Sequence, residues 1–241
     1  MKIKLFGILK TMIPGGKDLE VAFSEGEQVK DLVHTIQSEY PQVGELLDKK
    51  KVLVSVNQEI AHWDTVLETT DEVALLPPFA GGSGEFELMR KGNPMAIELE
   101  ESMLVRVQQE NFSIDEELHR VRSRSRRIGG IAMFLGTARD RSKGRDVSSM
   151  SFDHYEGMAQ KKLKEIRERA LGDFDIIEAL VLHRYGPIEI GENIVLIIVG
   201  AEHRADAFKA CQWCIDELKK ITPIWKMETT PEGEVWVEEH P

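Results

Sequence analysis

The chain has 241 residues, of which 41% are hydrophobic and 30% are charged, a composition typical of proteins that bury a core. Its net charge of -11 argues against general binding to nucleic acid or anionic membranes, because both need an excess of Lys and Arg. No apolar run approaches the roughly 20 residues that span a bilayer, and the amino terminus begins as a strand rather than a signal peptide. We therefore expect a cytoplasmic protein.

The amino-terminal part of the chain has the pattern of a small sheet with one main helix. Apolar residues spaced i, i+3, i+4 and i+7 over positions 29–36 predict a helix that ends at Pro41. Apolar residues at 43–47 predict a further short helical turn. Strands are expected at residues 2–9, 19–23, 52–56 and 73–76, with a turn at 14–16. This order of strands and helices predicts a β-grasp, the ubiquitin-like fold.

A Pro-Pro-Phe-Ala-Gly-Gly segment ends this part of the chain. Pro77 and Pro78 stop the last strand because proline supplies no backbone donor and favours an extended chain. Gly81 and Gly82 lack a Cβ, so they can enter a narrow channel and let another molecule approach the backbone closely. Residues 83–101 show no periodicity and predict a linker. From these residues alone, the segment fits either a hinge between domains or a tail that enters a neighbouring site.

The remaining residues, 102–241, alternate strands with helices, which indicates an α/β or α+β domain. Strands are expected at 103–107, 129–137, 147–155, 176–183, 194–201, 224–228 and 235–238, with a basic loop up to Asp146 and a Tyr-Gly-Pro turn after His183. Three helices are expected: one after a Ser113–Glu116 capping pattern, one with Ala159, Leu163, Ile166 and Ala170 inward, and one with Phe208, Cys211, Ile215 and Leu218 inward.

Basic residues and cysteines add two smaller observations. From His119 to Arg145 there are nine Lys or Arg residues and one acid, Asp140, a local basic patch that suits a small anionic ligand better than a polymer. Solvation of a helix end accounts for part of that charge. Cys211 and Cys214 have the spacing of a redox pair, but they lie inside a helical pattern without a second ligand pair. We therefore expect them to pack in the core, and we expect neither a metal site nor a cofactor.

Five polar residues follow or connect core elements of the carboxy-terminal part, where binding groups usually lie. Arg139 follows a strand, His203 and Arg204 stand between a buried strand and a helix, and Lys219 and Lys226 flank Pro223. Each has an ordinary structural explanation when taken alone; a lysine in the last helical turn, for example, complements the helix dipole. Together they offer cations, an imidazole and a lysine that can lose its proton, which suits a phosphate-bearing substrate and acid–base chemistry.

Several stretches resemble the two subunits of molybdopterin synthase. The residues at 54–60 and 71–82 are similar to the small, ubiquitin-like sulfur-carrier subunit. The large, catalytic subunit is resembled by Phe-Leu-Gly-Thr-Ala-Arg (134–139), His-Tyr-Glu-Gly-Met (154–158), His-Arg-Tyr-Gly-Pro-Ile-Glu-Ile-Gly-Glu (183–192), Glu-His-Arg-Ala-Asp-Ala-Phe (202–208) and Leu-Lys-Lys-Ile-Thr-Pro-Ile-Trp-Lys-Met-Glu (218–228). The resemblance covers nearly the whole chain apart from the linker. It implies an α+β protein with a carrier domain at 1–82, a linker at 83–101 and a catalytic domain at 102–241.

The resemblance also implies a reaction and roles for the candidate residues. The enzyme would be a sulfurtransferase that converts cyclic pyranopterin monophosphate to molybdopterin, using a thiocarboxylate that an adenylating, sulfur-loading enzyme forms on the last glycine, Gly82. Lys219 would act as general acid/base or transient covalent partner, and Lys226 would stabilise developing negative charge. Arg139, His203 and Arg204 would bind the substrate, with part of the pocket supplied by the second subunit of a homodimer.

One feature departs from the family. The carrier normally ends at its Gly-Gly, whereas here a peptide bond joins Gly82 to Ser83, so Gly82 has no carboxylate to load. We expect a processing protease to cut between these residues, since exposed linkers of small residues are preferred cleavage sites. Three alternatives stay open. A separate carrier supplies the sulfur and the fused copy is a placeholder; the protein is a regulator or scaffold whose uncut carrier domain occupies the pterin pocket; or a carrier of another sulfur pathway is fused to an unrelated domain.

Overall fold

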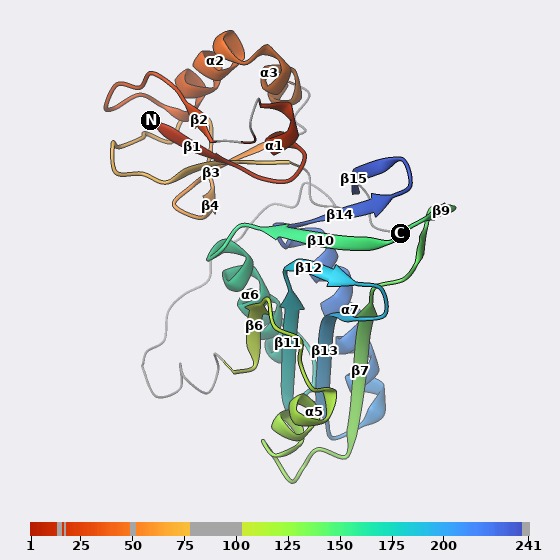
Figure 1. Cartoon of the computed structure of the whole chain (residues 1–241). Helices are drawn as coiled ribbons and strands as arrows, with labels where there is room; N and C mark the ends of the chain where they lie inside the picture. The colour runs from red at the N-terminus through yellow and green to blue at the C-terminus, as the bar shows by residue number, and fades with distance from the viewer. Residues whose placement is uncertain (14–15, 17, 49–51, 78–102, 238–241) are drawn as a thin grey trace.

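A computed structural model describes residues 1–13, 16, 18–48, 52–77 and 103–237, in two domains (Figure 1). The predicted turn at 14–16 lies largely outside these residues. So do the tail from 78 to 82, Ser83 and the linker at 83–101, and the boundaries at 82 and 101 therefore stay predictions. None of the helices in the described ranges is long and apolar enough to cross a membrane.

The amino-terminal domain is a five-stranded sheet in the order β2-β1-β5-β3-β4, in which β1 and β5 run parallel. Its largest helix, α2, begins with a capping box between Gln28 and Asp31 and turns Val29, Leu32, Val33 and Ile36 onto the sheet, as the spacing predicted. The elements are β1 (Lys2–Leu5), α1 (Leu9–Met12), β2 (Leu19–Glu20), α2 (Val29–Glu39), α3 (Pro41–Asp48), β3 (Leu53–Val56), β4 (Glu59–Ile60) and β5 (Val73–Leu76). This is the predicted β-grasp.

The first two strands are shorter than predicted. The strand expected at 2–9 ends at Leu5 because Gly7, with φ +53°, turns the chain, and Leu9 then begins α1 and enters the core. The strand expected at 19–23 covers only Leu19–Glu20. Apolar residues continue through both stretches, so periodicity alone could not locate the turn.

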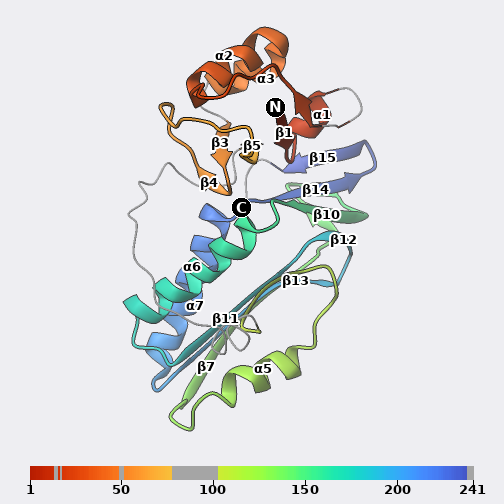
Figure 2. The ribbon, with the colours of Figure 1, turned by 90° about the vertical axis from the view of Figure 1, so that its left-hand side faces the viewer.

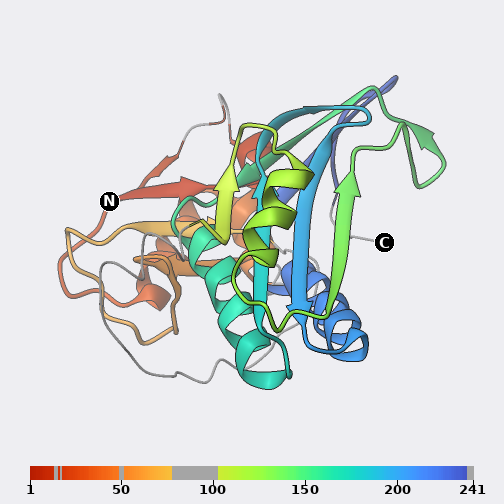
Figure 3. The ribbon, with the colours of Figure 1, turned by 90° about the horizontal axis from the view of Figure 1, so that it is seen from below.

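The carboxy-terminal domain contains two four-stranded sheets. The sheet with the longer strands, called the larger sheet, has the order β6-β11-β13-β7. Helices α6 and α7 pack on one of its faces and α5 on the other (Figures 2 and 3). The smaller sheet is antiparallel, in the order β12-β10-β14-β15. The elements of this domain are β6 (Val105–Gln108), α5 (Ile114–Arg122), β7 (Gly130–Thr137), β8 (Arg141–Ser142), β9 (Arg145–Asp146), β10 (Ser149–His154), α6 (Met158–Asp173), β11 (Glu178–Arg184), β12 (Gly186–Glu189), β13 (Asn193–Ala201), α7 (Arg204–Ile221), β14 (Ile224–Thr230) and β15 (Gly233–Val237).

Three predictions for this domain were wrong in detail. The basic loop before Asp146 contains a small hairpin, β8–β9, whose turn uses positive φ at Lys143 and Gly144. In the predicted Tyr-Gly-Pro turn, Gly186 and Pro187 already belong to strand β12, which lies at the edge of its sheet, where proline is tolerated. Phe208, expected to point inward, is 65% exposed.

The error at Phe208 has a simple geometric cause. The buried stripe of α7 runs through Ala207, Ala210, Cys211, Cys214 and Leu218, and Phe208 lies at its border in the first helical turn. The cysteine prediction is confirmed, since both thiols are free and buried in this stripe. Burial raises the pKa of Cys211 to about 11 and that of Cys214 to about 12, which leaves them unreactive thiols at neutral pH.

Candidate active site

The amino-terminal domain rests on the smaller sheet of the carboxy-terminal domain through an apolar cluster. Phe6 lies between Tyr155 and Trp225, with ring centroids 4.8 and 5.3 Å away. Ala74 and Leu76 of β5 complete the contact, together with Met158 at the start of α6. Ala74, Leu76, Tyr155 and Met158 are at most 2% exposed, and Phe6 and Trp225 are also buried. A fully desolvated aromatic cluster of this kind indicates a specific docking contact.

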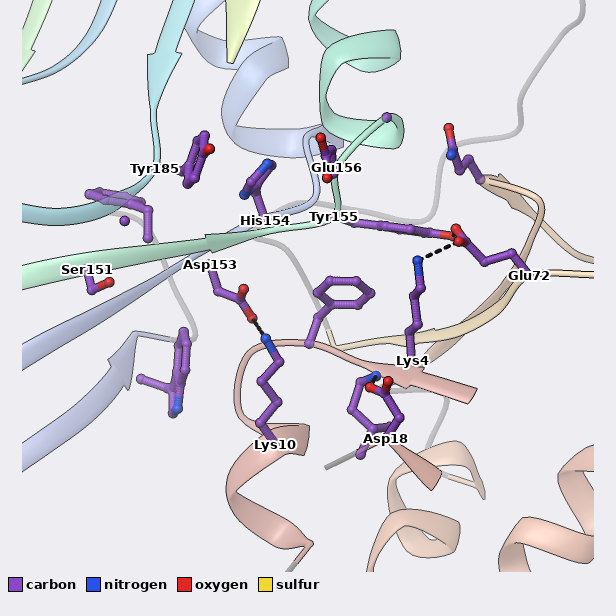
Figure 4. Close-up of a pocket in the computed structure, with 17 residues that line it drawn as sticks. Lys4, Lys10, Asp18, Glu72, Ser151, Asp153, His154, Tyr155, Glu156 and Tyr185 are labelled. Carbon is purple, nitrogen blue, oxygen red and sulfur yellow. Dashed lines mark hydrogen bonds and ion pairs between the residues drawn. The ribbon is translucent and has the colours of Figure 1, made fainter. Parts of the chain in front are cut away.

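Charged groups surround this cluster (Figure 4). Lys10 Nζ lies 2.8 Å from Asp153 Oδ2, and the same carboxylate oxygen accepts a hydrogen bond from the backbone N–H of Gly7. Tyr155 donates its hydroxyl to Glu72 at 2.6 Å, and Lys4 pairs with the same carboxylate at 2.5 Å. The hydrogen bonds from Lys4 and Tyr155 lower the pKa of Glu72, so the carboxyl is ionised at neutral pH.

An open cleft of about 950 Å³ runs along this junction and is lined by both domains. Figure 4 shows Asp153 and His154 on opposite sides of β10: Asp153 points to the amino-terminal domain, and His154 points to Tyr185, whose ring centroid is 4.1 Å away. Burial lowers the pKa of His154, so its imidazole is held neutral. Most charged side chains in this cleft are already paired: Asp18 with Lys2, Lys4 with Glu72, and Lys10 with Asp153. This pairing favours a docking seam over a ligand site.

The two faces of the smaller sheet carry different residues because side chains alternate along a strand. On β14, Trp225 faces the amino-terminal domain, whereas Ile224 packs in a separate cluster inside the carboxy-terminal domain. Lys226 lies two positions after Ile224 and Glu228 lies four positions after it, so both side chains are on the same face of β14 as Ile224. Lys226 Nζ is 2.7 Å from Glu228 Oε1, and Glu228 is fully buried.

The Lys226–Glu228 pair is linked to the basic β8–β9 hairpin. Burial alone would raise the pKa of Glu228, but the hydrogen bond from Lys226, the nearby Ser142 hydroxyl and the charge of Arg145 lower it on balance. Its Oε2 atom is buried without a hydrogen-bond partner among the described residues. A buried carboxylate with one open acceptor is costly unless a further donor arrives, so this is a candidate point for substrate or water to bind.

Three of the five predicted polar residues come to one end of the larger sheet. Thr137, at the end of β7, pairs with Asn193 at the start of β13, and α7 returns from the far end of β13. The last turn of α7, with Lys219, therefore ends near Arg139, which follows β7. Ala138 and Ile224 share one apolar cluster, which brings β14 and Lys226 to the same end.

His203 and Arg204 lie at the opposite end, exposed at the start of α7. Fifteen residues separate Arg204 from Lys219, which in a helix rising 1.5 Å per residue is roughly 22 Å. One chain therefore does not assemble all five residues in a single pocket. Gly82 and Ser83, the remaining candidates, lie outside the described residues.

Sequence reasoning missed Glu228, Trp225, Asp153 and Tyr155. The position of Glu228 could have been predicted, because a residue two positions after Lys226 in a strand lies on the same face as that lysine. The other three belong to the docking contact, whose partner residues are more than 70 positions away in sequence. Among the described residues no group of three or more His, Cys, Asp or Glu side chains is arranged to hold a metal ion.

Comparison with known proteins assigns both domains. The MoaE protein family model matches residues 107–221, and the ThiS family model matches residues 3–82. The molybdopterin synthase catalytic subunit of Pyrococcus abyssi is 47% identical over 129 residues, which are 54% of this chain and 86% of that protein. The same subunit of Ralstonia nicotianae is 41% identical over 134 residues, 56% of this chain and 76% of that protein.

A solved structure supports the same assignment. Molybdopterin synthase from Staphylococcus aureus matches 56% of this chain and 96% of its own with a TM-score of 0.53 and 28% identity. These relatives each cover little more than half of this chain, and the amino-terminal part is assigned by the ThiS family model. The chain therefore belongs to the molybdopterin synthase catalytic subunit family and carries a ThiS-family domain ahead of its catalytic domain.

Proposed function

We propose that this chain is a self-supplied molybdopterin synthase made as one precursor. Its carrier domain would deliver sulfur from a thiocarboxylate at Gly82 to cyclic pyranopterin monophosphate, which forms the dithiolene of molybdopterin. The observation that carries this proposal is the docking of the ThiS-family domain on the catalytic domain: its last described residue, Pro77, accepts a hydrogen bond at 3.2 Å from Trp225, the neighbour of Lys226.

The length of the tail supports delivery in this direction. Five residues separate Pro77 from Gly82, and an extended chain covers at most about 3.3–3.6 Å per residue, so Gly82 can reach about 17 Å from Pro77. Lys226 follows Trp225 directly on β14. A tail that starts beside Trp225 is therefore long enough to pass around the smaller sheet and approach the lysines on the other face.

The two lysines would have different roles. Lys219, half-buried in the last turn of α7, would act as general acid/base or as a transient covalent partner of the carrier carbonyl. Lys226 is held against the ionised Glu228, which suits a fixed cation that stabilises developing negative charge. The thiocarboxylate sulfur would be the nucleophile, since this group is ionised at neutral pH.

Substrate binding would need two copies of the chain. Arg139 lies at the lysine end, whereas His203 and Arg204 lie roughly 22 Å away at the start of α7. A homodimer that brings the start of α7 from one copy to the lysine end of the other would complete a cationic pocket for the phosphate and pterin. Equal mixing of inactive Lys219→Ala and His203→Ala chains, with exchange of subunits, should then restore about one quarter of the wild-type activity. No recovery would contradict a shared pocket.

Release of the Gly82 carboxylate is a necessary step, because adenylation and sulfur loading by a separate enzyme require a free carboxyl group. We propose that a protease cuts between Gly82 and Ser83. The two family models leave residues 83–106 unmatched, and the catalytic core begins only at Leu104 and Val105, which supports an interdomain segment ahead of them that can be cut without damage to either domain. The apolar docking contact would keep the two parts together afterwards.

The test is the intact mass of the protein purified from its own cells, before and after incubation in native extract. Two fragments that separate after Gly82, the smaller one also present with one oxygen replaced by sulfur, are expected. The processed protein should then convert cyclic pyranopterin monophosphate to molybdopterin. A single uncut mass under every condition would contradict self-supply.

A regulatory or scaffold role is the second candidate, and one observation favours it. The carrier domain is docked in the uncut chain, which keeps the start of its tail beside β14, so the uncut carrier domain can occupy the pocket of its own chain. This role predicts that the uncut chain lowers the turnover of a processed synthase and that the processed chain has no turnover of its own. Turnover by the processed chain would exclude it.

A further inference from the structure

Trp225 lies where the body of the carrier domain ends and its tail begins. Its indole N–H donates to the carbonyl oxygen of Pro77, and its ring stacks on Phe6 at an interplanar angle of 17°. Gly7 makes this approach possible: a Cβ there would lie 3.0 Å from Trp225 Cγ and 3.1 Å from Pro77 Cγ. The backbone of Gly7 also has φ +53°, which favours glycine.

The hydrogen bond at this junction differs in kind from the apolar contacts around it. The indole is 6% exposed, so its N–H has no access to bulk water as an alternative acceptor. The Pro77 carbonyl is the last described backbone acceptor before the tail. Apolar packing is non-directional, whereas a hydrogen bond fixes the direction of one peptide plane and hence the direction in which the next residues leave.

We propose that Trp225 is a positioning residue for sulfur delivery: its N–H holds the Pro77 carbonyl so that the following five residues leave toward Lys226 and Lys219. This inference rests on the proposed function. Trp225 and Lys226 are consecutive on β14 and face opposite sides of the sheet, so the strand that holds the base of the tail also carries a residue of the pocket. A fixed starting point shortens the search of the tail for its target.

The chain contains a matched control for this N–H. Trp236 on β15 packs against the same apolar cluster, but its Nε1 is buried without a hydrogen-bond partner among the described residues. Trp236→Phe therefore removes a ring nitrogen without removing a hydrogen bond that the described residues make. Trp225→Phe keeps an aromatic ring for Phe6 but loses the donor to Pro77 together with part of the indole area, and Trp236→Phe controls for that loss of area.

The test is a cross-linking measurement in the full, uncut chain. A Gly82→Cys substitution is introduced, and a short reagent that joins a thiol to an amine is added. Cys211 and Cys214 do not compete, because both are buried and burial raises the pKa of each thiol. Peptide mass spectrometry then gives the fraction of chains linked to Lys219 or Lys226.

Trp225→Phe should lower this fraction about three- to tenfold, the range expected for one net hydrogen bond, while Trp236→Phe leaves it unchanged. Gly7→Ala, which presses on both Trp225 and Pro77, should lower it as well and tests the same junction if Trp225→Phe unfolds the protein. In the processed enzyme, Trp225→Phe should reduce kcat with little change in KM for the pterin. Equal yields in Trp225→Phe and Trp236→Phe, or no link to either lysine in the parent Gly82→Cys chain, would overturn the proposal.

This design separates two kinds of failure. If the wild-type processed protein has no turnover, the proposed function fails, but the cross-linking yield still reports whether Trp225 directs the tail. If turnover is normal and the cross-linking yield does not depend on Trp225, the proposed function is supported and the positioning role of Trp225 is contradicted.

Discussion

The two faces of the smaller sheet of the catalytic domain carry residues with different roles. The face that meets the carrier domain carries Tyr155 and Trp225 in an aromatic cluster, which is bordered by partly exposed ion pairs such as that of Asp153 with Lys10. The opposite face carries Lys226 paired with a fully buried Glu228. Because strand side chains alternate, residues next to each other in sequence serve docking on one side and the proposed chemistry on the other.

This difference indicates which substitutions act on activity and which act on docking. Changes on the pocket face should reduce turnover or stability and leave the carrier domain docked. Changes on the carrier face should loosen docking while the buried pair stays intact. The predictions below test that separation, from the largest expected effect to the smallest.

Lys219→Ala should reduce turnover by the processed enzyme with a loaded carrier by about 10²- to 10⁴-fold, the range for loss of a general acid/base. Stability and docking should be unchanged, because Lys219 is only half-buried at a helix end. The neighbouring Lys220→Ala is the control, since Lys220 is exposed and pairs with Glu217. Full turnover by Lys219→Ala would remove Lys219 from the mechanism.

Glu228→Gln should destabilise the protein by about 3 kcal/mol, because it leaves the ammonium of Lys226 buried without a carboxylate. Thermal or denaturant unfolding measures this loss. Glu234→Gln, at an exposed position of β15, should have little effect. The double variant Lys226→Met/Glu228→Leu should recover part of the stability while abolishing turnover, since no unpaired charge remains. Equal stability of Glu228→Gln and wild type would contradict the role assigned to the pair.

Tyr155→Phe should weaken docking by about 1 kcal/mol, since it removes the hydroxyl donated to Glu72 and keeps the ring beside Phe6. Hydrogen–deuterium exchange over residues 149–155 of the full chain should become about fivefold faster. Tyr40→Phe, which alters a ring packed in the carrier core, is the matched control. A change in exchange for both variants would indicate general destabilisation rather than loss of a docking bond.

His154 should contribute a small pH dependence of stability. Burial lowers its pKa in the folded protein, only partly offset by Asp153 and Glu156, so the unfolded chain takes up a proton at higher pH than the folded chain. Stability should therefore decrease as pH falls below the usual His value of about 6.5. His154→Gln should flatten the curve in that range, as measured by denaturant unfolding at several pH values. An unchanged slope would assign the dependence to other groups.

Local patterns in the sequence were sufficient for most of the secondary structure. Helix α2 follows from its apolar spacing, and the nearly continuous apolar run at 194–201 correctly indicated the buried strand β13. The resemblance supplied both domain families: relatives confirm the catalytic domain, and a family model confirms the amino-terminal domain. The predicted strand ends at 9 and 23 were wrong because apolar residues continue past the observed ends at Leu5 and Glu20. In the first strand, Gly7 makes the turn that ends it.

The tertiary structure decided which residues share a site. Sequence could name Arg139, His203, Arg204, Lys219 and Lys226, but only the path of α7 places His203 and Arg204 roughly 22 Å from Lys219. It could name the tail from Pro77, but not Trp225 as the residue that receives it, because that contact joins positions 148 apart. Local spacing reports the neighbours of a residue within one helix or strand, whereas a docking contact depends on how two separate cores meet.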